Sequence, residues 1–316
     1  MILSVSRRTD IPTFYSDWFF NRVKDGNVCV RNPMNKYQVS RVKITPDVVD
    51  CIVFWSKDPK PMLSRLDELR DYKYYFQFTL NGYDSDLEPH LSSVEERIDT
   101  FQKLSDKIGS KCVIWRYDPI VFTDKYSADC HLKKFGQIAE SLYGYTNKVV
   151  ISFVDVYGTK NKTNLNAAGY KPMKEGQLNE FAKSLAEIAR ANGMEITTCA
   201  EAIDLDFCGI KHNSCIDQDL IESIIGYPIK VKADGQREAC GCVKCEDIGT
   251  YNTCLHGCRY CYANYKDDQV KEMYAHYDVD SPILCDVLDE RVDKITDRPL
   301  KSLRDGSKMA GQMSLF

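Results

Sequence analysis

The sequence lacks a long apolar segment and an excess of positive charge. No hydrophobic run approaches the ~20 residues that cross a bilayer, and residues 1–8 lack the layout of a secretion signal. The 42 Lys and Arg residues are outnumbered by 46 Asp and Glu. Proteins that mainly bind nucleic acid usually carry a basic excess, so this partner class has little support. We therefore expect a cytoplasmic protein with no membrane partner.

Cysteine, in contrast, is abundant. The chain has 14 cysteines, and nine of them lie between residues 199 and 261. In a reducing compartment, clustered cysteines indicate metal or redox chemistry more often than disulfides. Cys51 and Cys112 lie outside the cluster in apolar runs, and we expect them to be small buried hydrophobic residues.

The first two hundred residues alternate between short apolar runs and segments of helical period. Helices are predicted over Val94–Lys107 and Glu175–Asn192, among others. The alternation predicts an α/β fold with parallel strands, and six units favour a partial (β/α)6 TIM-like barrel. An open doubly wound sheet is the alternative. The six predicted strands are Ile2–Ser6, Cys51–Trp55, Tyr74–Leu80, Cys112–Arg116, Val149–Val154 and Ile196–Thr198.

Three regions follow from this pattern. We expect a βα-repeat barrel over residues 1–202, a cysteine-rich cluster region over 203–265 that completes the barrel, and a C-terminal helix and tail over 266–316. Short helices are predicted over Asp217–Ile225 and Lys266–Tyr277. The polar segment Lys301–Phe316 is expected to be flexible or to lie on the surface.

Polar residues gather at the carboxyl ends of the predicted strands. In barrels, chemistry takes place at this end. The amino ends carry no comparable set, so we predict a polar pocket at one mouth of the barrel. The residues concerned are Ser6–Asp10, Ser56–Asp58, Thr79, Asn81, Arg116, Asp118, Ser152, Asp155, Tyr157, Thr198, Cys199 and Glu201.

Six cysteines within 22 positions predict a metal site, for which two interpretations compete. Cys242-x2-Cys245 and Cys258-x2-Cys261 form two knuckles that suit one tetrahedral zinc. Cys254-x3-Cys258-x2-Cys261 instead places three thiolates on one loop. Since a [4Fe–4S] cluster normally takes four cysteines, three would leave one iron open to a ligand.

The second spacing resembles the cluster loop of radical S-adenosylmethionine (SAM) enzymes. Residues 254–263 closely resemble the cluster loop of proteins of the spore photoproduct lyase type, and Leu87–Arg97 and Asp118–Val121 resemble further segments of those proteins. Through the Ser6–Asp10 opening and the C-terminal cysteine loop, the whole chain is identified as a member of the domain of unknown function 1848 family.

The position of the loop departs from that of other radical SAM enzymes, where it follows the first strand. Here it comes after six βα units. A circular permutation accounts for this order. It predicts that the strand around Asp247–Thr253 docks beside Ile2–Ser6.

The resemblance implies a mechanism and a set of binding residues. A [4Fe–4S] cluster would bind the amino and carboxylate groups of SAM, and one electron would cleave a carbon–sulfur bond to give a 5′-deoxyadenosyl radical that abstracts hydrogen from the substrate. An electron donor such as ferredoxin or flavodoxin is implied, and the substrate is a small molecule or a peptide. The implied residues are Cys254, Cys258 and Cys261 for the cluster, Tyr260 for adenine, Asp10 for the amino group, Arg7, Arg8, Lys57 and Arg116 for the carboxylate, and Thr79, Asn81, Ser152 and Asp155 for the ribose.

The cysteines outside this loop predict a second [4Fe–4S] cluster, with a structural zinc as the alternative. His256, inside the loop, is expected to face solvent. Two other functions stay open: a zinc-stabilised βα-barrel protein, or an iron–sulfur electron carrier that does not cleave SAM. The ligands of the second site are predicted to be Cys215, Cys240 and Cys242 with one of Cys199, Cys208 or Cys245.

Overall fold

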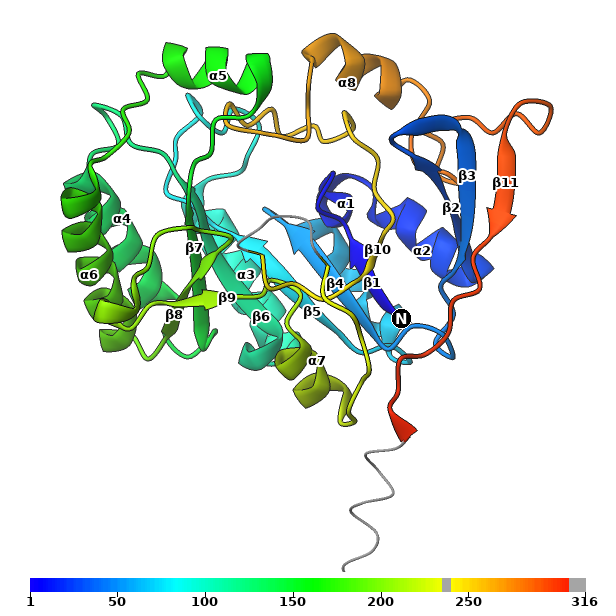
Figure 1. Cartoon of the computed structure of the whole chain (residues 1–316), viewed down its shortest axis with the longest axis horizontal. Helices are drawn as coiled ribbons and strands as arrows, with labels where there is room; N and C mark the ends of the chain where they lie inside the picture. Colours follow the sequence, from blue (N-terminus) through cyan, green and yellow to red (C-terminus); the bar gives the residue numbers. More distant parts are fainter. Residues whose placement is uncertain (235–239, 307–316) are drawn as a thin grey trace, which may run out of the picture.

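The computed structural model describes residues 1–234 and 240–306, and its main feature is a parallel sheet of eight strands (Figure 1). Their order is β10-β1-β4-β5-β6-β7-β8-β9, and every neighbouring pair runs parallel. The sheet is open, with β10 and β9 as its edges in the part of the chain described. The bounds are β1 (Ile2–Val5), β4 (Cys51–Ser56), β5 (Tyr74–Thr79), β6 (Val113–Ile120), β7 (Lys148–Phe153), β8 (Glu195–Cys199), β9 (Lys211–Asn213) and β10 (Glu246–Asp247).

All six strands predicted from apolar runs are confirmed, as β1 and β4 to β8. A parallel strand that is buried on both faces has a continuous apolar sequence, so these strands could be predicted from the sequence alone. The largest difference is in β6, which continues past Arg116 to Ile120. The α/β class with a large parallel sheet is therefore confirmed.

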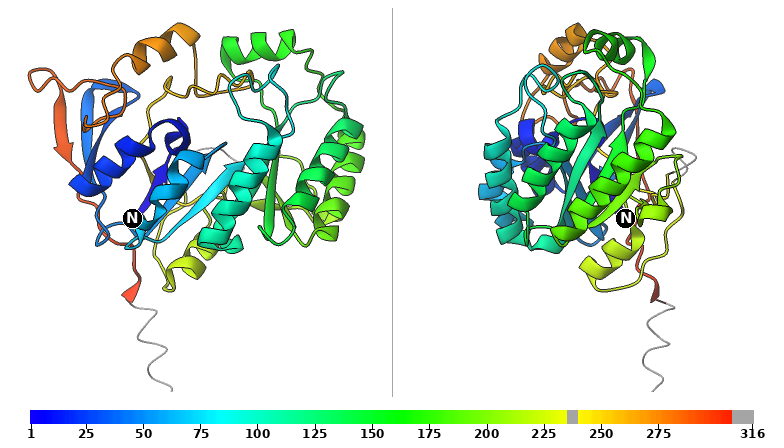
Figure 2. Two further views of the ribbon diagram at one scale, coloured as in Figure 1. Left: turned by 180° about the vertical axis from the view of Figure 1, so that it is seen from behind. Right: turned by 90° about the vertical axis from the view of Figure 1, so that its left-hand side faces the viewer.

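Four helices cover one face of the sheet (Figure 2). Aromatic side chains join the two layers: the ring of Phe19 lies 5.4 Å from that of Phe54, and Trp115 stacks on Phe135 at 4.8 Å. Burying these large rings supplies much of the apolar stabilisation of the fold. The helices are α2 (Ser16–Asp25), α3 (Val94–Ile108), α4 (Ala128–Ser141) and α6 (Glu175–Ala191).

The opposite face is covered by α7 (Gln218–Ile225) and the cysteine-rich chain around it. The predicted helices over 94–107, 175–192, 217–225 and 266–277 are confirmed as α3, α6, α7 and α8 (Asp267–Tyr274). For α3 the start is set by a capping box, in which the Ser93 side chain accepts from the Glu96 backbone and the Glu96 side chain accepts from Ser93. Shorter helices are α1 (Ile11–Phe14) and α5 (Gly158–Ala167), with 3-10 turns η1 (Lys60–Leu69), η2 (Ser110–Cys112) and η3 (Asp206–Cys208).

A second, three-stranded sheet was not predicted. β2 (Asn27–Asn32) and β3 (Asn35–Lys43) form an antiparallel hairpin, and β11 (Lys294–Asp297) pairs with β3. The polar character of β3 hides it from a search for apolar runs, and its partner β11 lies some 250 positions away in the sequence. Arg31 fixes the arrangement by pairing with Asp286 and Asp293, each at 2.5 Å.

The cysteine-rich region reaches both edges of the main sheet. β9 extends the sheet beside β8, and β10 pairs with β1 through Leu3–Glu246 and Ser4–Asp247. The predicted docking of the strand before the cysteine loop beside the N-terminal strand is thus confirmed, although β10 is only two residues long.

Three smaller expectations have different outcomes. Cys51 is buried as predicted, whereas Cys112 lies half-buried in η2, because the strand begins one residue later. In the predicted tail, Ser302 and Leu303 both hydrogen-bond to Asp50, so the tail's start is held against the sheet. Residues 307–316 lie outside the described part. No helix among the described residues combines the length and apolar character needed to span a membrane.

Candidate functional site

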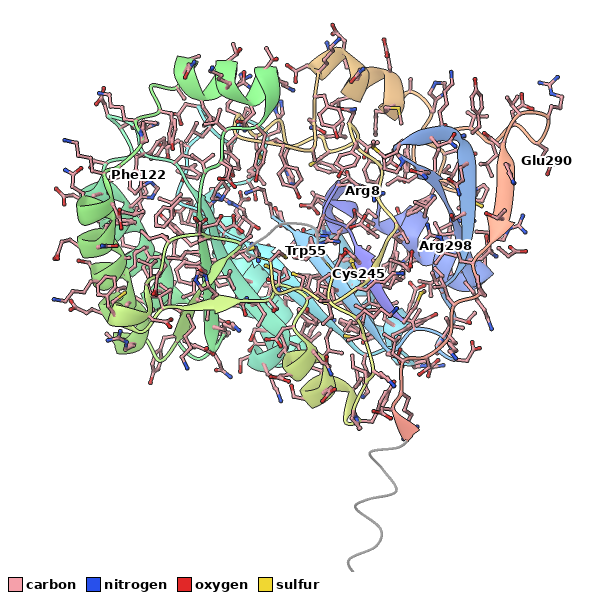
Figure 3. All side chains as sticks on the ribbon, in the orientation of Figure 1. Arg8, Trp55, Phe122, Cys245, Glu290 and Arg298 are labelled. Atoms are coloured by element: carbon pink, nitrogen blue, oxygen red, sulfur yellow. The ribbon has the colours of Figure 1, made fainter. Side chains whose placement is uncertain are left out.

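A cavity of about 800 Å³ opens where the strands end. The carboxyl ends of β1, β4, β5, β6, β7 and β8 all contribute to its wall, as expected when parallel strands end along one edge of a sheet. The polar pocket predicted from these strand ends is therefore present. Figure 3 shows Arg8, Trp55 and Cys245 of its lining near the middle of the molecule. The eight cysteines of the lining are Cys199, Cys215, Cys240, Cys242, Cys245, Cys254, Cys258 and Cys261.

The loop carrying the last three cysteines is held by its own backbone. The side-chain amide of Asn264 donates to the Cys254 carbonyl at 2.7 Å, and within the backbone the Cys261 amide donates to the Cys258 carbonyl at 3.1 Å. Gly257 has a φ of +67°, and a Cβ there would lie 2.9 Å from the ring of His90. The loop therefore needs glycine both for its backbone angle and for its close approach to the segment before α3.

His256 anchors the loop to the end of β1. Its Nε2 lies 2.8 Å from Oδ2 of Asp10, and its side chain is buried. The expectation that His256 faces solvent is wrong, because Asp10 supplies a buried acceptor that sequence spacing does not reveal. Burial alone would raise the pKa of Asp10, but the contact with His256 and the hydrogen bonds from Lys57 and Ser56 lower it overall.

Asp10 has its own place in the fold as the N-cap of α1. Its oxygens accept from the Thr13 and Lys57 amides at 3.0 and 2.7 Å and from the Ser56 hydroxyl at 2.8 Å. Together with His256 this makes four hydrogen bonds to one carboxylate. One residue thus ties the ends of β1 and β4 to the cysteine loop.

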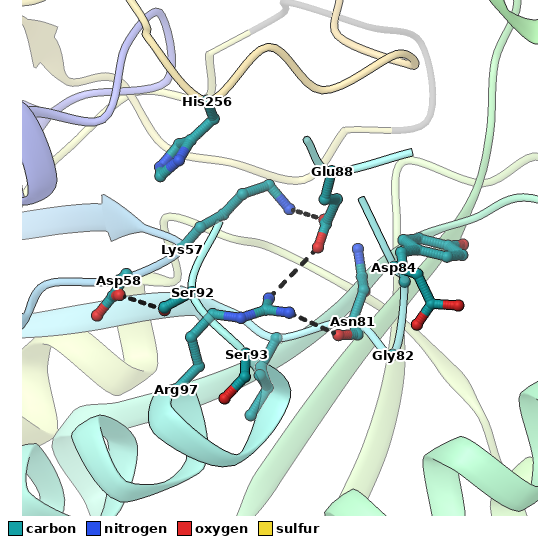
Figure 4. A network of polar contacts seen from close by, with 12 residues as sticks. Lys57, Asp58, Asn81, Gly82, Asp84, Glu88, Ser92, Ser93, Arg97 and His256 are labelled. Atoms are coloured by element: carbon teal, nitrogen blue, oxygen red, sulfur yellow. Dashed lines mark hydrogen bonds and ion pairs between the residues drawn. The ribbon is translucent and has the colours of Figure 1, made fainter. Parts of the chain in front are cut away.

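A second anchor is a buried charge network around Glu88 (Figure 4). Lys57 and Arg97 pair with its two oxygens at 2.8 and 3.4 Å, and Tyr260 donates a short hydrogen bond to it. Lys57 also lies 2.9 Å from the Tyr260 hydroxyl. Burial raises the pKa of Glu88, but the two cations outweigh it, so the carboxyl stays ionised. One carboxylate thus joins β4, α3 and the cysteine loop.

The three loop thiols face the same enclosed space and affect one another. Burial raises the pKa of Cys254 well above its usual range, and the neighbouring Cys261 and Cys258 raise it further. Burial also raises the pKa of Cys258 to about 12, opposed by the Lys57 ammonium. Three adjacent thiols that hold their protons are a set that a metal centre can bind, with release of those protons.

Two further observations fit a bound group in this space. The Nδ1 atom of His256 is buried and has no hydrogen-bond partner among the described residues, so one polar atom beside the loop is left unsatisfied. Lys57 places a positive charge next to Cys258, which favours an anionic thiolate centre. Residues 1–234 and 240–306 contain no preformed group of three or more His, Cys, Asp or Glu side chains for a metal ion, so the thiols would have to draw together around one.

The cationic residues predicted to bind the carboxylate of SAM differ in the partners that they already have. Arg116 forms a close ion pair with Asp118, and Lys57 is engaged by Glu88. Arg7 lies 3.7 Å from Asp234 and 3.3 Å from the Cys245 sulfur. All three line the cavity.

Arg8 has looser contacts. It lies 3.9 Å from Asp247, donates to the Gly249 carbonyl at 3.2 Å and covers the Tyr251 ring at 5.2 Å. Asn81 is fully buried behind the cavity wall, where its amide exchanges hydrogen bonds with the Asp118 backbone at 3.0 and 2.8 Å.

Sequence reasoning placed Asp247 at the start of a strand but gave its carboxylate no role in the site. Its carboxylate accepts from the hydroxyls of Ser4 and Ser6 at 2.8 and 2.6 Å, and from the amides of Arg7 and Gly249 at 2.9 and 3.0 Å. It therefore shapes the turn that carries Arg7 and Arg8. A lone aspartate in a two-residue strand gives no signal in the sequence, because its role depends on the pairing of β10 with β1.

Comparisons with known proteins identify a family. The model of the family described as "Domain of unknown function (DUF1848)" matches residues 2–263. Among curated proteins, no significant match to the chain was found.

The chain also has matches among solved structures, and the likeness to the one described here is weak. It is the crystal structure of a "putative alpha-L-fucosidase" from Bacteroides thetaiotaomicron VPI-5482, which is 15% identical, with 56% of this chain and 72% of that chain covered and a TM-score of 0.25. A likeness at this TM-score carries no argument about function.

Proposed function

The chain belongs to the domain of unknown function 1848 family, and for this member we propose a radical SAM-type iron–sulfur enzyme. Its cluster would be held by Cys254, Cys258 and Cys261. One observation carries the proposal: these three thiols line a single cavity together with the carboxyl ends of six parallel strands. The CX3CX2C spacing adds the resemblance to radical SAM enzymes.

The finer description of the fold is part of this proposal. We propose a circularly permuted partial (β/α)6 barrel, in which β10 takes the place of the first strand. Two facts support it. β10 lies beside β1 at the edge of the sheet, and the cysteine loop follows β10 and enters the cavity at the same end as the other strands. The cysteine loop then has the spatial position of a loop after a first strand.

The chain's own residues bind and orient the reactants. When bound, a reduced [4Fe–4S] cluster supplies the electron that cleaves the carbon–sulfur bond of SAM. Lys57 places a positive charge beside Cys258, and Tyr260 is fixed by Glu88 at the wall where adenine would lie. Asp10 already accepts four hydrogen bonds, so we assign it to positioning His256 and the loop.

Arg8 is our choice for the carboxylate of SAM. It lines the cavity, and its nearest carboxylate, Asp247, is 3.9 Å away. Lys57 and Arg116 are committed to Glu88 and Asp118 by closer ion pairs. A guanidinium can bind a carboxylate through two parallel hydrogen bonds, which suits this role.

The proposal also fixes the kinds of partner. The reaction needs a one-electron donor such as ferredoxin or flavodoxin, found in the cytoplasm. The substrate is a small molecule or a peptide that fits the cavity of about 800 Å³.

The test starts with protein purified without oxygen. We would measure iron, acid-labile sulfide and zinc, and then the release of 5′-deoxyadenosine from SAM after reduction. The informative pair of variants is Cys254→Ala and Cys245→Ala. We expect Cys254→Ala to lose about four irons and all SAM cleavage, and Cys245→Ala to keep both.

The alternatives give different results. A zinc on Cys242, Cys245, Cys258 and Cys261 requires that Cys245→Ala loses the metal and Cys254→Ala keeps it. An electron carrier would hold the cluster but release no 5′-deoxyadenosine. Either outcome overturns the radical SAM proposal.

A further inference from the structure

We propose that Cys199, Cys215, Cys240 and Cys242 form a second, thiolate-bound metal centre in the wall of the cavity, separate from the cysteine loop. This centre is a site in its own right and does not depend on SAM cleavage. All four residues line the cavity. Four cysteine sulfurs select soft metals, which means an iron–sulfur cluster or zinc.

The contact between the thiols is the first observation. The sulfurs of Cys199 and Cys215 lie 2.9 Å apart, and the thiol of Cys242 is a further hydrogen-bond neighbour of Cys215. Cys215 and Cys242 are almost fully enclosed. As a metal enters, each thiol loses its proton and the two close sulfurs move apart around it.

The polar surroundings suit an anionic centre. Arg116 donates from Nη1 to the Cys215 sulfur at 2.9 Å, and its guanidinium stays charged. The Ile216 amide lies 3.4 Å from the Cys242 sulfur. Hydrogen bonds of this kind to ligand sulfurs stabilise thiolates and tune the metal.

The backbone brings Cys240 to the same place. The Ser214 hydroxyl donates to the Gly241 carbonyl at 2.6 Å, and the Val243 amide donates to the Ile216 carbonyl at 3.1 Å. Residues 240–243 therefore run alongside residues 214–216. A Cβ on residue 241 would lie 2.6 Å from the Ser214 oxygen, so glycine permits this approach.

The structure also selects among the candidate fourth ligands. Cys199 ends β8 and faces Cys215 across the sheet end. Cys208 packs into the apolar core, where its thiol contacts the Leu205 carbonyl at 3.2 Å, and it does not line the cavity. Cys245 is turned toward Arg7 and Asp247. Cys199 is therefore the ligand, and Cys208 provides a matched control.

The test isolates the second centre. In a full-length variant with Cys254→Ala, Cys258→Ala and Cys261→Ala, the loop cannot bind a cluster. After anaerobic incubation with ferrous iron and sulfide, or with zinc, we would measure metal and sulfide per chain and the absorption spectrum. We expect about four irons with matching sulfide, or one zinc.

Single changes in that background decide the ligands. Adding Cys199→Ala should remove most of the metal, whereas adding Cys208→Ala should leave it unchanged. Thermal unfolding of both variants without metal shows whether the fold survives. Metal-free protein in the triple variant, or full metal content after Cys199→Ala, would overturn the proposal. Failure of the proposed function is measured separately in the protein with an intact loop, as no release of 5′-deoxyadenosine from SAM after reduction or as metal lost with Cys245→Ala and kept with Cys254→Ala.

Discussion

At the scale of the residue, Gly257 gives the sharpest test of the cysteine loop. Its φ of +67° and the 2.9 Å approach of His90 leave no room for a side chain. We expect Gly257→Ala to cost about 1–2 kcal/mol in backbone strain alone and to reduce iron bound per chain after reconstitution. Iron analysis of the purified variant measures this.

The matched control is Gly176→Ala. Gly176 lies in the first turn of α6, and a Cβ there meets nothing within 4 Å. Its replacement should leave iron content unchanged and raise stability slightly, because alanine favours the helix. Equal iron content in the two variants would mean that the loop tolerates a side chain at position 257.

Glu201 predicts a pH dependence of stability. Burial raises its pKa to about 7, opposed by the hydrogen bond from the Phe153 amide and reinforced by Asp155 and Asp118. The folded state therefore holds a proton that the unfolded state, with an ordinary pKa near 4.5, has released. Stability from this group is complete below pH 4.5 and is lost as the pH rises to about 7.

Glu201→Gln should remove this dependence, since an amide oxygen can still accept from Phe153. As the pH rises from 5 to 8, we expect the free energy of unfolding of the variant to increase by roughly 2 kcal/mol relative to that of the wild type. Urea unfolding of both proteins at the two pH values measures the difference. Parallel pH profiles would show that Glu201 does not titrate in this range.

Residue spacing revealed the cysteines but not what holds them. Cys254, Cys258 and Cys261 were predicted to be metal ligands because such ligands recur at short, fixed intervals. His256 contacts Asp10, which lies 246 positions away in the sequence, and Glu88 contacts Tyr260, which lies 172 positions away. Such contacts depend on the fold, so spacing along the chain cannot show them.

At the scale of the element, Glu88 links β4, α3 and the cysteine loop. Glu88→Gln would leave Lys57 and Arg97 near one another without their shared carboxylate. Because removing one partner of a buried ion pair is costly, we expect a loss of about 3 kcal/mol. Urea unfolding measures it, with the exposed Glu95→Gln on α3 as a control that should change stability by no more than about 0.5 kcal/mol. Equal effects would exclude the network as a stabilising element.

The helices and strands differed in how well the sequence alone predicted them. Buried parallel strands and capped amphipathic helices carry their signal in their own sequence, as in β5 and α3. The hairpin of β2 and β3 is stabilised by Arg31 and by β11, both through residues near the C-terminal end. A local sequence pattern cannot predict pairing with such a distant segment.

At the scale of the molecule, removal of metal should loosen one side of the cavity. Buried thiols without metal keep their protons, and a metal that binds only the folded state adds stability. We expect chelation to lower the melting temperature and to speed amide exchange in residues 240–261, with β5 to β7 unchanged. Hydrogen exchange with mass spectrometry measures this. Uniform exchange before and after chelation would mean that the metal does not contribute to folding.

The pairing of β10 with β1 also determines when the sheet can be completed during synthesis of the chain. The ribosome completes β1 at the start of synthesis, but its neighbour follows more than 240 residues later. Until then the nascent sheet exposes an apolar strand edge, of the kind that invites wrong pairing. The thiols of residues 240–261 are also made after β1 and β4 to β9, so the metal that we propose there would bind after those strands have been synthesised. A product that ends before residue 240 would display the strand ends without the part of the cavity's wall that residues 240–263 supply.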